Sequence, residues 1–128
     1  MSAIFESREL AAEVAEKLRV YAQPQRLMIL SCLLRGERTV AEIGEITEIT
    51  QPALSQQLAE LRRADLVSTR KEAKQVWYSL ASDSVDLCVH TMEAIFCGGQ
   101  HKLALPTMSP STPVEKSLVG VAAFAKVV

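Results

Sequence analysis

The fold of this chain is decided by residues 39–80, which read TVAEIGEITEITQPALSQQLAELRRADLVSTRKEAKQVWYSL. Apolar residues recur there at helical spacing in two runs of three, which are Val40, Ile43 and Ile46 and then Leu54, Leu58 and Leu61. Such spacing is typical of short amphipathic helices. It predicts two helices that share one buried side and are joined by a turn at residues 48–50.

The second of these helices has a start signal and a distinctive outer face. Thr50 is the expected N-cap, and Pro52 lies in the first turn, where its missing N–H costs little. Because the leucines face inward, four uncharged polar residues are left to point largely outward, namely Gln51, Ser55, Gln56 and Gln57. Amides and hydroxyls can hydrogen-bond base edges, and a helix docked by its N-terminal residues suits the major groove. The pattern favours a DNA-recognition helix over an ordinary polar surface helix.

A β-hairpin is expected to follow this helix. Residues 66–70 and 75–80 are the predicted strands, and the charged sequence KEAK at 71–74 is the predicted tip. In the second strand, Val76, Tyr78 and Leu80 alternate with polar or aromatic neighbours, which is the period of a strand. The sequence therefore predicts helix, turn, helix and wing.

Positive charge gathers at the end of the recognition helix and along the wing, on Arg62, Arg63, Arg70, Lys71 and Lys74. DNA phosphates would lie there. The predicted DNA contacts are these five cations together with Thr50, Gln51, Pro52, Ser55 and Gln56. Composition alone leaves a plain solvated hairpin as the alternative, because Asp65 and Glu72 dilute the charge.

Composition limits the class of protein. The chain has 128 residues, of which 48% are hydrophobic and 23% charged, with a net charge of -1 and a pI of about 6.1. These values fit one small domain whose DNA-binding charge is local. No apolar stretch approaches the roughly 20 residues of a membrane span, and the N-terminus lacks a signal sequence, so we expect a cytoplasmic protein. Hydrolase, phosphate-loop and CxxC motifs are absent from the sequence, which predicts neither an enzyme nor a cofactor.

Three further helices are expected around this unit. Residues 6–20 predict an amphipathic helix, residues 24–36 predict a helix that is apolar almost all round, and residues 82–97 predict a last helix with a broad apolar surface. That surface exceeds what one small domain needs. We therefore expect a mainly α fold with a small hairpin wing, which forms a homodimer through its first and last helices and matches a palindromic operator.

The C-terminal part differs in composition from the rest. Residues 1–98 are the expected DNA-binding and dimerisation domain, and residues 99–112 are an expected flexible linker rich in Pro and Ser. Residues 113–128 are apolar, and Thr112 with Glu115 has the spacing of a capping box, which predicts a helix. This segment either docks on the dimer or orders only with a partner.

The order of elements and three phrases, QPQRLMIL, QPALSQQLAELRRADLV and KQVWYSL, resemble the ArsR-type winged-helix repressors over residues 12–97. QPALSQQL and AIFC are most similar to the thiol-based, BigR/HlyU-like members. The resemblance implies a cysteine in the second helix and one at the end of the last, which reactive sulfur or an oxidant joins so that the dimer leaves its operator. By resemblance, Cys32 and Cys97 are the candidate pair.

One departure from the family pattern concerns the second helix. Without a gap, the phrase QPQRLMIL places the family's first cysteine at Ser31, one residue before Cys32. One residue on a helix is a turn of about 100° and a rise of about 1.5 Å, and a disulfide tolerates little misplacement. Three outcomes follow: a bridge through a longer sulfur chain, a rotated or displaced helix, or a pair that never closes. Cys88 is expected to be a small core residue.

Two alternatives stay open within this fold. A metal sensor is the first, because Asp86, Cys88, His90 and Glu93 lie on the last helix, although the spacing differs from that of the family's zinc sensors. The helix VAEIGEI lacks the cysteines of the arsenic and cadmium sensors, and His90 is otherwise a solvent-facing residue. A winged-helix interaction module is the second alternative, and salt-dependent DNA binding would separate it from a repressor.

Overall fold

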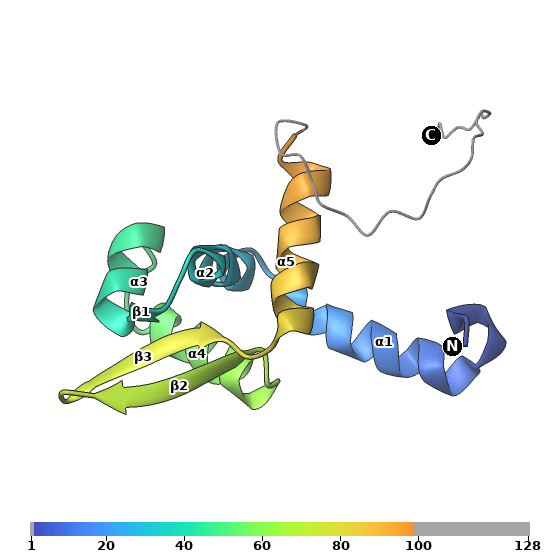
Figure 1. The fold of residues 1–128 in the computed structure, drawn as a ribbon, viewed down its shortest axis with the longest axis horizontal. Helices are drawn as coiled ribbons and strands as arrows, with labels where there is room; N and C mark the ends of the chain where they lie inside the picture. The colour runs from blue at the N-terminus through green and yellow to red at the C-terminus, as the bar shows by residue number, and fades with distance from the viewer. Residues whose placement is uncertain (1, 99–128) are drawn as a thin grey trace. The chain divides into compact units, whose positions relative to one another are not determined.

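The computed structural model describes residues 2–98 of the chain. The expected linker at 99–112 and the expected apolar segment at 113–128 lie outside the described residues. Along the chain the elements are η1 (Ile4–Glu6), α1 (Arg8–Tyr21), α2 (Pro24–Leu34), β1 (Arg38–Thr39), α3 (Val40–Thr47), α4 (Ala53–Arg63), β2 (Val67–Glu72), β3 (Gln75–Leu80) and α5 (Asp83–Phe96) (Figure 1). The predicted mainly helical fold with a hairpin wing is confirmed.

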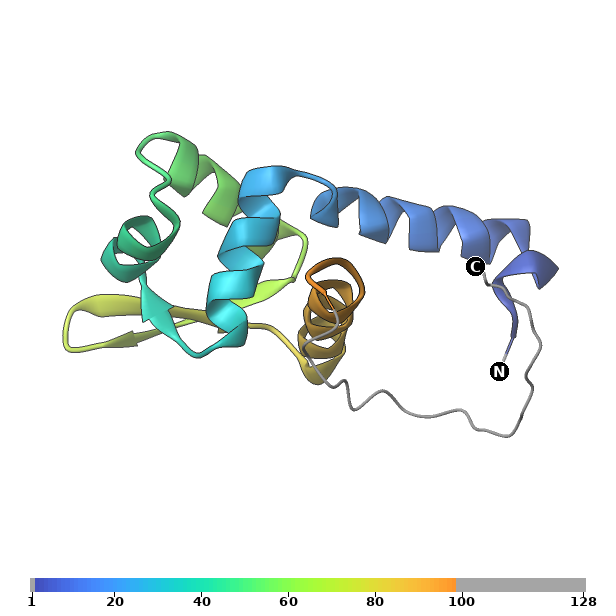
Figure 2. The same ribbon diagram turned by 90° about the horizontal axis from the view of Figure 1, so that it is seen from above.

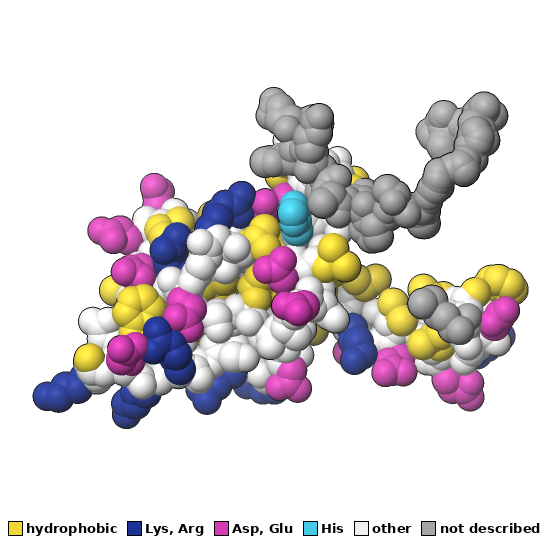
Figure 3. All heavy atoms as spheres, in the orientation of Figure 1, with side chains coloured by type: hydrophobic (Ala, Val, Ile, Leu, Met, Phe, Trp, Pro, Cys, Tyr) yellow, Lys and Arg dark blue, Asp and Glu magenta, His cyan; other side chains and the backbone are white. Residues whose placement is uncertain are grey.

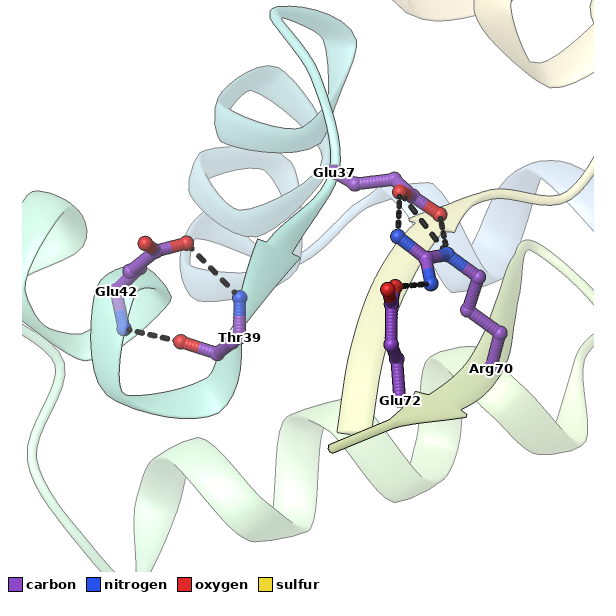
Figure 4. A network of polar contacts seen from close by, with 5 residues as sticks. All are labelled: Glu37, Thr39, Glu42, Arg70 and Glu72. Carbon is purple, nitrogen blue, oxygen red and sulfur yellow. Dashed lines mark hydrogen bonds and ion pairs between the residues drawn. The ribbon is translucent and has the colours of Figure 1, made fainter. Parts of the chain in front are cut away.

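Most helices begin at a side chain that accepts a hydrogen bond from the first turn. Ser7 caps α1, and Gln23 caps α2, where Pro24 occupies the first helical position. Ser82 caps α5, since its hydroxyl accepts from the N–H of Val85 at 3.3 Å. Thr39 and Glu42 form a reciprocal capping box at the start of α3 (Figure 4). The capping groups satisfy N–H groups that have no partner within the helix.

The prediction of Thr50 as the N-cap of α4 is wrong. Pro52 occupies the N-cap position, and its side chain makes no capping bond. The amide of Gln51 caps the helix instead, because its Oε1 accepts from the N–H of Ser55 at 3.1 Å. Thr50 contributes only its carbonyl oxygen, which accepts from the N–H of Leu54 at 3.0 Å.

The wing belongs to a sheet with one more strand than was predicted. Within the described residues the strand order is β1-β3-β2, and β3 is antiparallel to both neighbours. Strand β1 could not be predicted from the sequence, because its two residues, Arg38 and Thr39, are too few to show alternation. The predicted tip at 71–74 is too long, since Lys71 and Glu72 belong to β2. Ala73 and Lys74 form a two-residue turn with φ of 53° and 70°, a backbone that matches the twist of hairpin strands.

The hydrophobic core is built around α2. Figure 1 shows α2 between α3 and α5, with the sheet along one side. Ile29 and Leu30 of α2, Ile43 of α3 and Leu61 of α4 have no exposed surface. The three predicted leucines of α4 are all buried. Burial on several sides explains why α2 is apolar almost all round.

The predicted buried face of α3 is only partly correct. Ile43 is fully buried, but Ile46 is 55% exposed. Residues three apart on a helix are about 60° apart around its axis, so both cannot point directly at the core. Ile49, which follows the helix, is buried and closes this side of the core instead.

Within residues 2–98 the apolar stripe of helix α1, formed by Leu10, Val14 and Leu18, is only partly covered. Both ribbon views show α1 extending away from α3, α4 and the wing (Figure 1, Figure 2). Of the residues described in α1, Tyr21 is the one that is buried. Leu18 is 51% exposed. No helix among residues 2–98 has the length and apolar character needed to cross a membrane.

We expect Ile43→Ala to lower the free energy of unfolding by about 2–5 kcal/mol, because it empties a fully buried site. Ile46→Ala is the matched control on the same helix and should change it by about 0.5 kcal/mol or less. Urea unfolding followed by circular dichroism at one fixed protein concentration measures both. Equal losses in the two variants would contradict the core described here.

Candidate nucleic-acid interface and cysteine pocket

The outer face of α4 presents polar and basic side chains opposite its buried leucines. Ser55 and Gln56 are exposed near its start, and Arg62 and Arg63 are exposed at its end. In Figure 3, Lys and Arg side chains gather along the lower edge, over α4 and the wing. A shallow hollow of about 400 Å³ lies between α4 and β3, and its lining includes Ser55, Arg62 and Tyr78. This face combines groups that can reach base edges with cations that suit phosphates.

Two of the amides predicted to point outward have partners within the chain. The Oε1 of Gln51 accepts from the hydroxyl of Ser55 at 2.6 Å as well as from its N–H. The Oε1 of Gln57 accepts from the Nε of Arg26 on α2 at 2.8 Å, so Gln57 is half-buried and faces α2. Gln56 is the exposed amide of the helix itself. The Arg26–Gln57 bond could not be predicted from local sequence patterns, because the two residues are 31 positions apart.

Arg70 on the wing is held by two carboxylates. Its Nη2 and Nε lie 2.9 Å from Oε1 and Oε2 of Glu37, and its Nη1 pairs with Glu72 (Figure 4). The guanidinium also lies 5.5 Å from the ring centre of Trp77, within the range of a cation–π contact. The pKa of Glu37 is lowered mainly by the hydrogen bond from Arg70. Lys71 and Lys74 are exposed on the same wing.

A pocket of about 530 Å³ opens between α2 and α5, and we call it the cysteine pocket. Its lining residues include Cys32 from α2, Ile46 from α3, and Phe96 and Cys97 from the end of α5. Cys32 is only 6% exposed, whereas Cys97 is exposed, and both are free thiols. The structure therefore brings the two candidate cysteines to one cavity.

Cys88 lies apart from this pocket. It is a half-buried free thiol packed against the hydrophobic core, as the sequence predicted. Burial raises the pKa of Tyr21 to about 12, and a hydrogen bond with Cys88 contributes to the rise. This contact places Cys88 on the side of α5 that faces the end of α1.

Ser31, where the family resemblance would place the first cysteine, takes part in a polar lock between α2 and α5. Its hydroxyl donates to Oε2 of Glu93. Arg35 holds the same carboxylate with two bonds, Nη1 to Oε2 at 3.0 Å and Nη2 to Oε1 at 2.9 Å. The Nη1 of Arg35 also donates to the carbonyl of Ser31 at 2.8 Å. A bidentate pair of this kind fixes the relative position of the two helices at the edge of the cysteine pocket.

Burial and nearby charged groups shift the pKa of the Cys32 thiol in opposite directions. Burial raises the pKa of the Cys32 thiol and is the largest effect. Polar interaction with Arg38 and the charges of Arg38 and Arg35 oppose this rise, while Glu42 adds to it. A thiolate at Cys32 would thus be favoured by two guanidinium groups and disfavoured by burial and by Glu42.

The metal-binding alternative has little support from the geometry. Asp86 and His90 are exposed on α5, one helical turn apart. Within residues 2–98 no three side chains of His, Cys, Asp or Glu are grouped so that they could hold a metal ion.

Comparison with known proteins gives consistent matches. The model for bacterial regulatory proteins of the arsR family matches residues 23–69. The biofilm growth-associated repressor of Agrobacterium fabrum is 45% identical over 93 residues, which cover 73% of this chain and 80% of that protein. The transcriptional activator HlyU of Vibrio cholerae is 40% identical over 92 residues, covering 72% of this chain and 85% of that one. The crystal structure of the transcriptional repressor BigR from Xylella fastidiosa superimposes with a TM-score of 0.68 at 36% identity, covering 76% and 99% of the two chains.

The exposures of the thiols predict an order of alkylation. We expect iodoacetamide to modify Cys97 fastest and Cys32 slowest in the native protein, because Cys32 is buried and its pKa is raised. Peptide mapping by mass spectrometry after timed quenching measures the three rates. In denaturant the three rates should converge. Native modification of Cys32 as fast as that of Cys97 would contradict the burial described here.

Proposed function

This chain belongs to the arsR family of bacterial regulatory proteins, and we propose that it is a homodimeric repressor whose operator binding is switched by thiol chemistry at Cys32 and Cys97. Membership makes it a DNA-binding transcriptional regulator similar to BigR and HlyU, as its sequence predicted. The observation that supports the switch is that a buried and an exposed thiol line one pocket between α2 and α5.

The proposed DNA contacts come from α4, its preceding turn and the wing. Ser55 and Gln56 would meet base edges in the major groove, and Thr50, Gln51 and Pro52 lie at the same end of the helix. Arg62, Arg63, Lys71 and Lys74 provide the charge for phosphates. Arg70 is the fifth predicted cation, and it would have to exchange Glu37 or Glu72 for a phosphate to make such a contact.

The proposed dimer forms through α1 and α5. Within residues 2–98 the apolar stripe of α1 has little cover, and Leu87, Ile95 and Phe96 of α5 are 50%, 62% and 79% exposed. A second copy would cover both faces through a two-fold axis. Two copies of α4 could then enter major grooves about 34 Å apart, as a palindromic operator requires.

The proposed chemistry starts at Cys97, because it is the exposed thiol of the pair. Its thiolate attacks the outer sulfur of an organic persulfide, RSSH, and becomes a persulfide while RS⁻ leaves. The Cys32 thiolate then attacks the Cys97 sulfur, forms the Cys32–Cys97 bond and releases hydrosulfide. If the Cys97 persulfide first attacks the outer sulfur of a second RSSH and RS⁻ leaves, attack by Cys32 with loss of hydrosulfide gives a bridge with one more sulfur atom, which would accommodate the one-residue shift from Ser31. A peroxide would reach the same disulfide through a sulfenic acid on Cys97.

The bridge would act on DNA binding by shifting the population of dimer geometries. It joins α2 to α5 next to the lock formed by Ser31, Arg35 and Glu93. Helix α2 also holds the recognition helix through Arg26 and Gln57. A new constraint on α2 therefore favours a geometry in which the two α4 helices no longer match successive grooves.

We expect the reduced protein to bind DNA from its own upstream region and persulfide treatment to weaken binding roughly 5- to 150-fold, the usual range for coupled sites. Cys32→Ser and Cys97→Ser should keep the reduced affinity after treatment, because neither can form the bridge. Cys88→Ser is the matched control, and its DNA affinity should still fall after persulfide treatment. Fluorescence anisotropy at fixed salt measures the affinities. An unchanged affinity of the wild-type protein after treatment would refute the thiol switch.

Variants of α4 separate base reading from phosphate contact. We expect Gln56→Ala to weaken operator binding by about 1–3 kcal/mol and to reduce discrimination against unrelated DNA. Arg62→Gln should weaken binding to both DNAs and reduce the slope of log affinity against log salt by about 1. Arg19→Gln, on the polar face of α1, is the control cation. A protein that shows no salt-dependent DNA binding would be an interaction module instead.

A further inference from the structure

Arg38 carries a buried donor without a partner. Its Nε is the buried side-chain nitrogen or oxygen that lacks a hydrogen bond within residues 2–98. The backbone of Arg38 is fixed, because β1 pairs it with Tyr78 on β3 and the next residue, Thr39, caps α3. Folded proteins pair nearly all such groups, so an unpaired guanidinium nitrogen points to an interaction that forms in another chemical state.

The groups around Cys32 indicate what that interaction is. Arg38 approaches from β1, Arg35 from the end of α2, Glu42 from α3, and Glu93 with Cys97 from α5 across the pocket. Arg35 is already engaged in two bonds with Glu93 and one with the Ser31 carbonyl. Arg38 is the guanidinium near Cys32 whose unpaired donor is buried.

We propose that Arg38 is a positioning residue that holds the Cys32 sulfur in its anionic form, with Nε becoming paired when the sulfur carries charge. The proposal rests on the thiol switch of the preceding section and names the residue that lets its buried thiol react. Cys32 loses its proton to solvent, and its thiolate attacks the Cys97 sulfur of a Cys97 persulfide. The Cys32–Cys97 bond forms, the bond to the outer sulfur breaks, and hydrosulfide leaves with the electron pair. The persulfide is the oxidant.

The burial of Cys32 explains why its thiolate needs stabilisation by Arg38. Cys32 is 6% exposed, so water cannot stabilise its thiolate well. Burial is the largest influence on its pKa and acts against ionisation, while Arg38 acts in favour. Without Arg38 the second step would wait for a thiolate that is rarely present near neutral pH.

The test uses the full chain with Cys88→Ser and Cys97→Ser, so that Cys32 is the single thiol. The rate of Cys32 alkylation by iodoacetamide is measured from about pH 6 to pH 10.5, a range that spans the ordinary thiol pKa of about 8.5. In Arg38→Gln the inflection should move to higher pH, and the rate at pH 7 should fall roughly tenfold for a rise of one in the pKa. The plateau at high pH should stay unchanged, because accessibility is the same. Arg19→Gln is the matched control and should keep the parent profile.

A second variant keeps the proposal open to refutation if Arg38→Gln fails to fold. Arg38→Met retains the apolar stem and also removes the charge, and circular dichroism checks both variants. An inflection equal to the parent's in a folded variant overturns the proposal. The alkylation uses neither DNA nor persulfide, so it stands apart from the operator experiment. A shifted inflection without operator release leaves Arg38 acting on Cys32 but refutes the switch, and the reverse result refutes only the role of Arg38.

Discussion

The burial of α2 on several sides is the constraint on which the rest of this structure depends. Ile29 and Leu30 have no exposed surface, and Cys32 and Leu33 are nearly as buried. A helix with so much apolar surface must be covered by α3 and α4 on one side and by α5 on the other. Both the DNA-binding helix and the cysteine pocket are therefore built against the same helix.

The segment that leaves α2 connects these parts by polar contacts. Arg35 bonds to Glu93 on α5, Glu37 to Arg70 on the wing, and Thr39 to the first turn of α3. The ion pairs are partly exposed, so each contributes little to stability on its own. Their importance is geometric, because three residues within a segment of five contact three elements around the end of α2.

Local periodicity predicted the helices well but not the contacts between them. The leucines of α4 and the apolar α2 follow a helical period, so their burial could be predicted from the sequence. Three features depend instead on where neighbouring elements end, namely the two-residue β1, the cap from Gln51 and the exposure of Ile46. The periodicity of apolar residues does not contain that information. Resemblance to a family pointed to Cys32 and Cys97, and the fold brought them to one pocket. Glu37 and Arg26 each bond to a residue more than thirty positions away, so their roles could not be predicted from the sequence. The DNA contacts stay predictions.

The hydrogen bond from Arg26 to Gln57 has a mechanical consequence. Arg26 and Cys32 lie on the same eleven-residue helix, six residues or about 9 Å apart along its axis. A helix of this length is stiff, so it behaves as a short rod with a sulfur at one end and the recognition helix attached at the other. A small tilt of the rod at the sulfur end must be matched by a displacement at the Gln57 end. The orientation of α4 is thus set by a lever that it shares with the thiol, rather than by α4 alone.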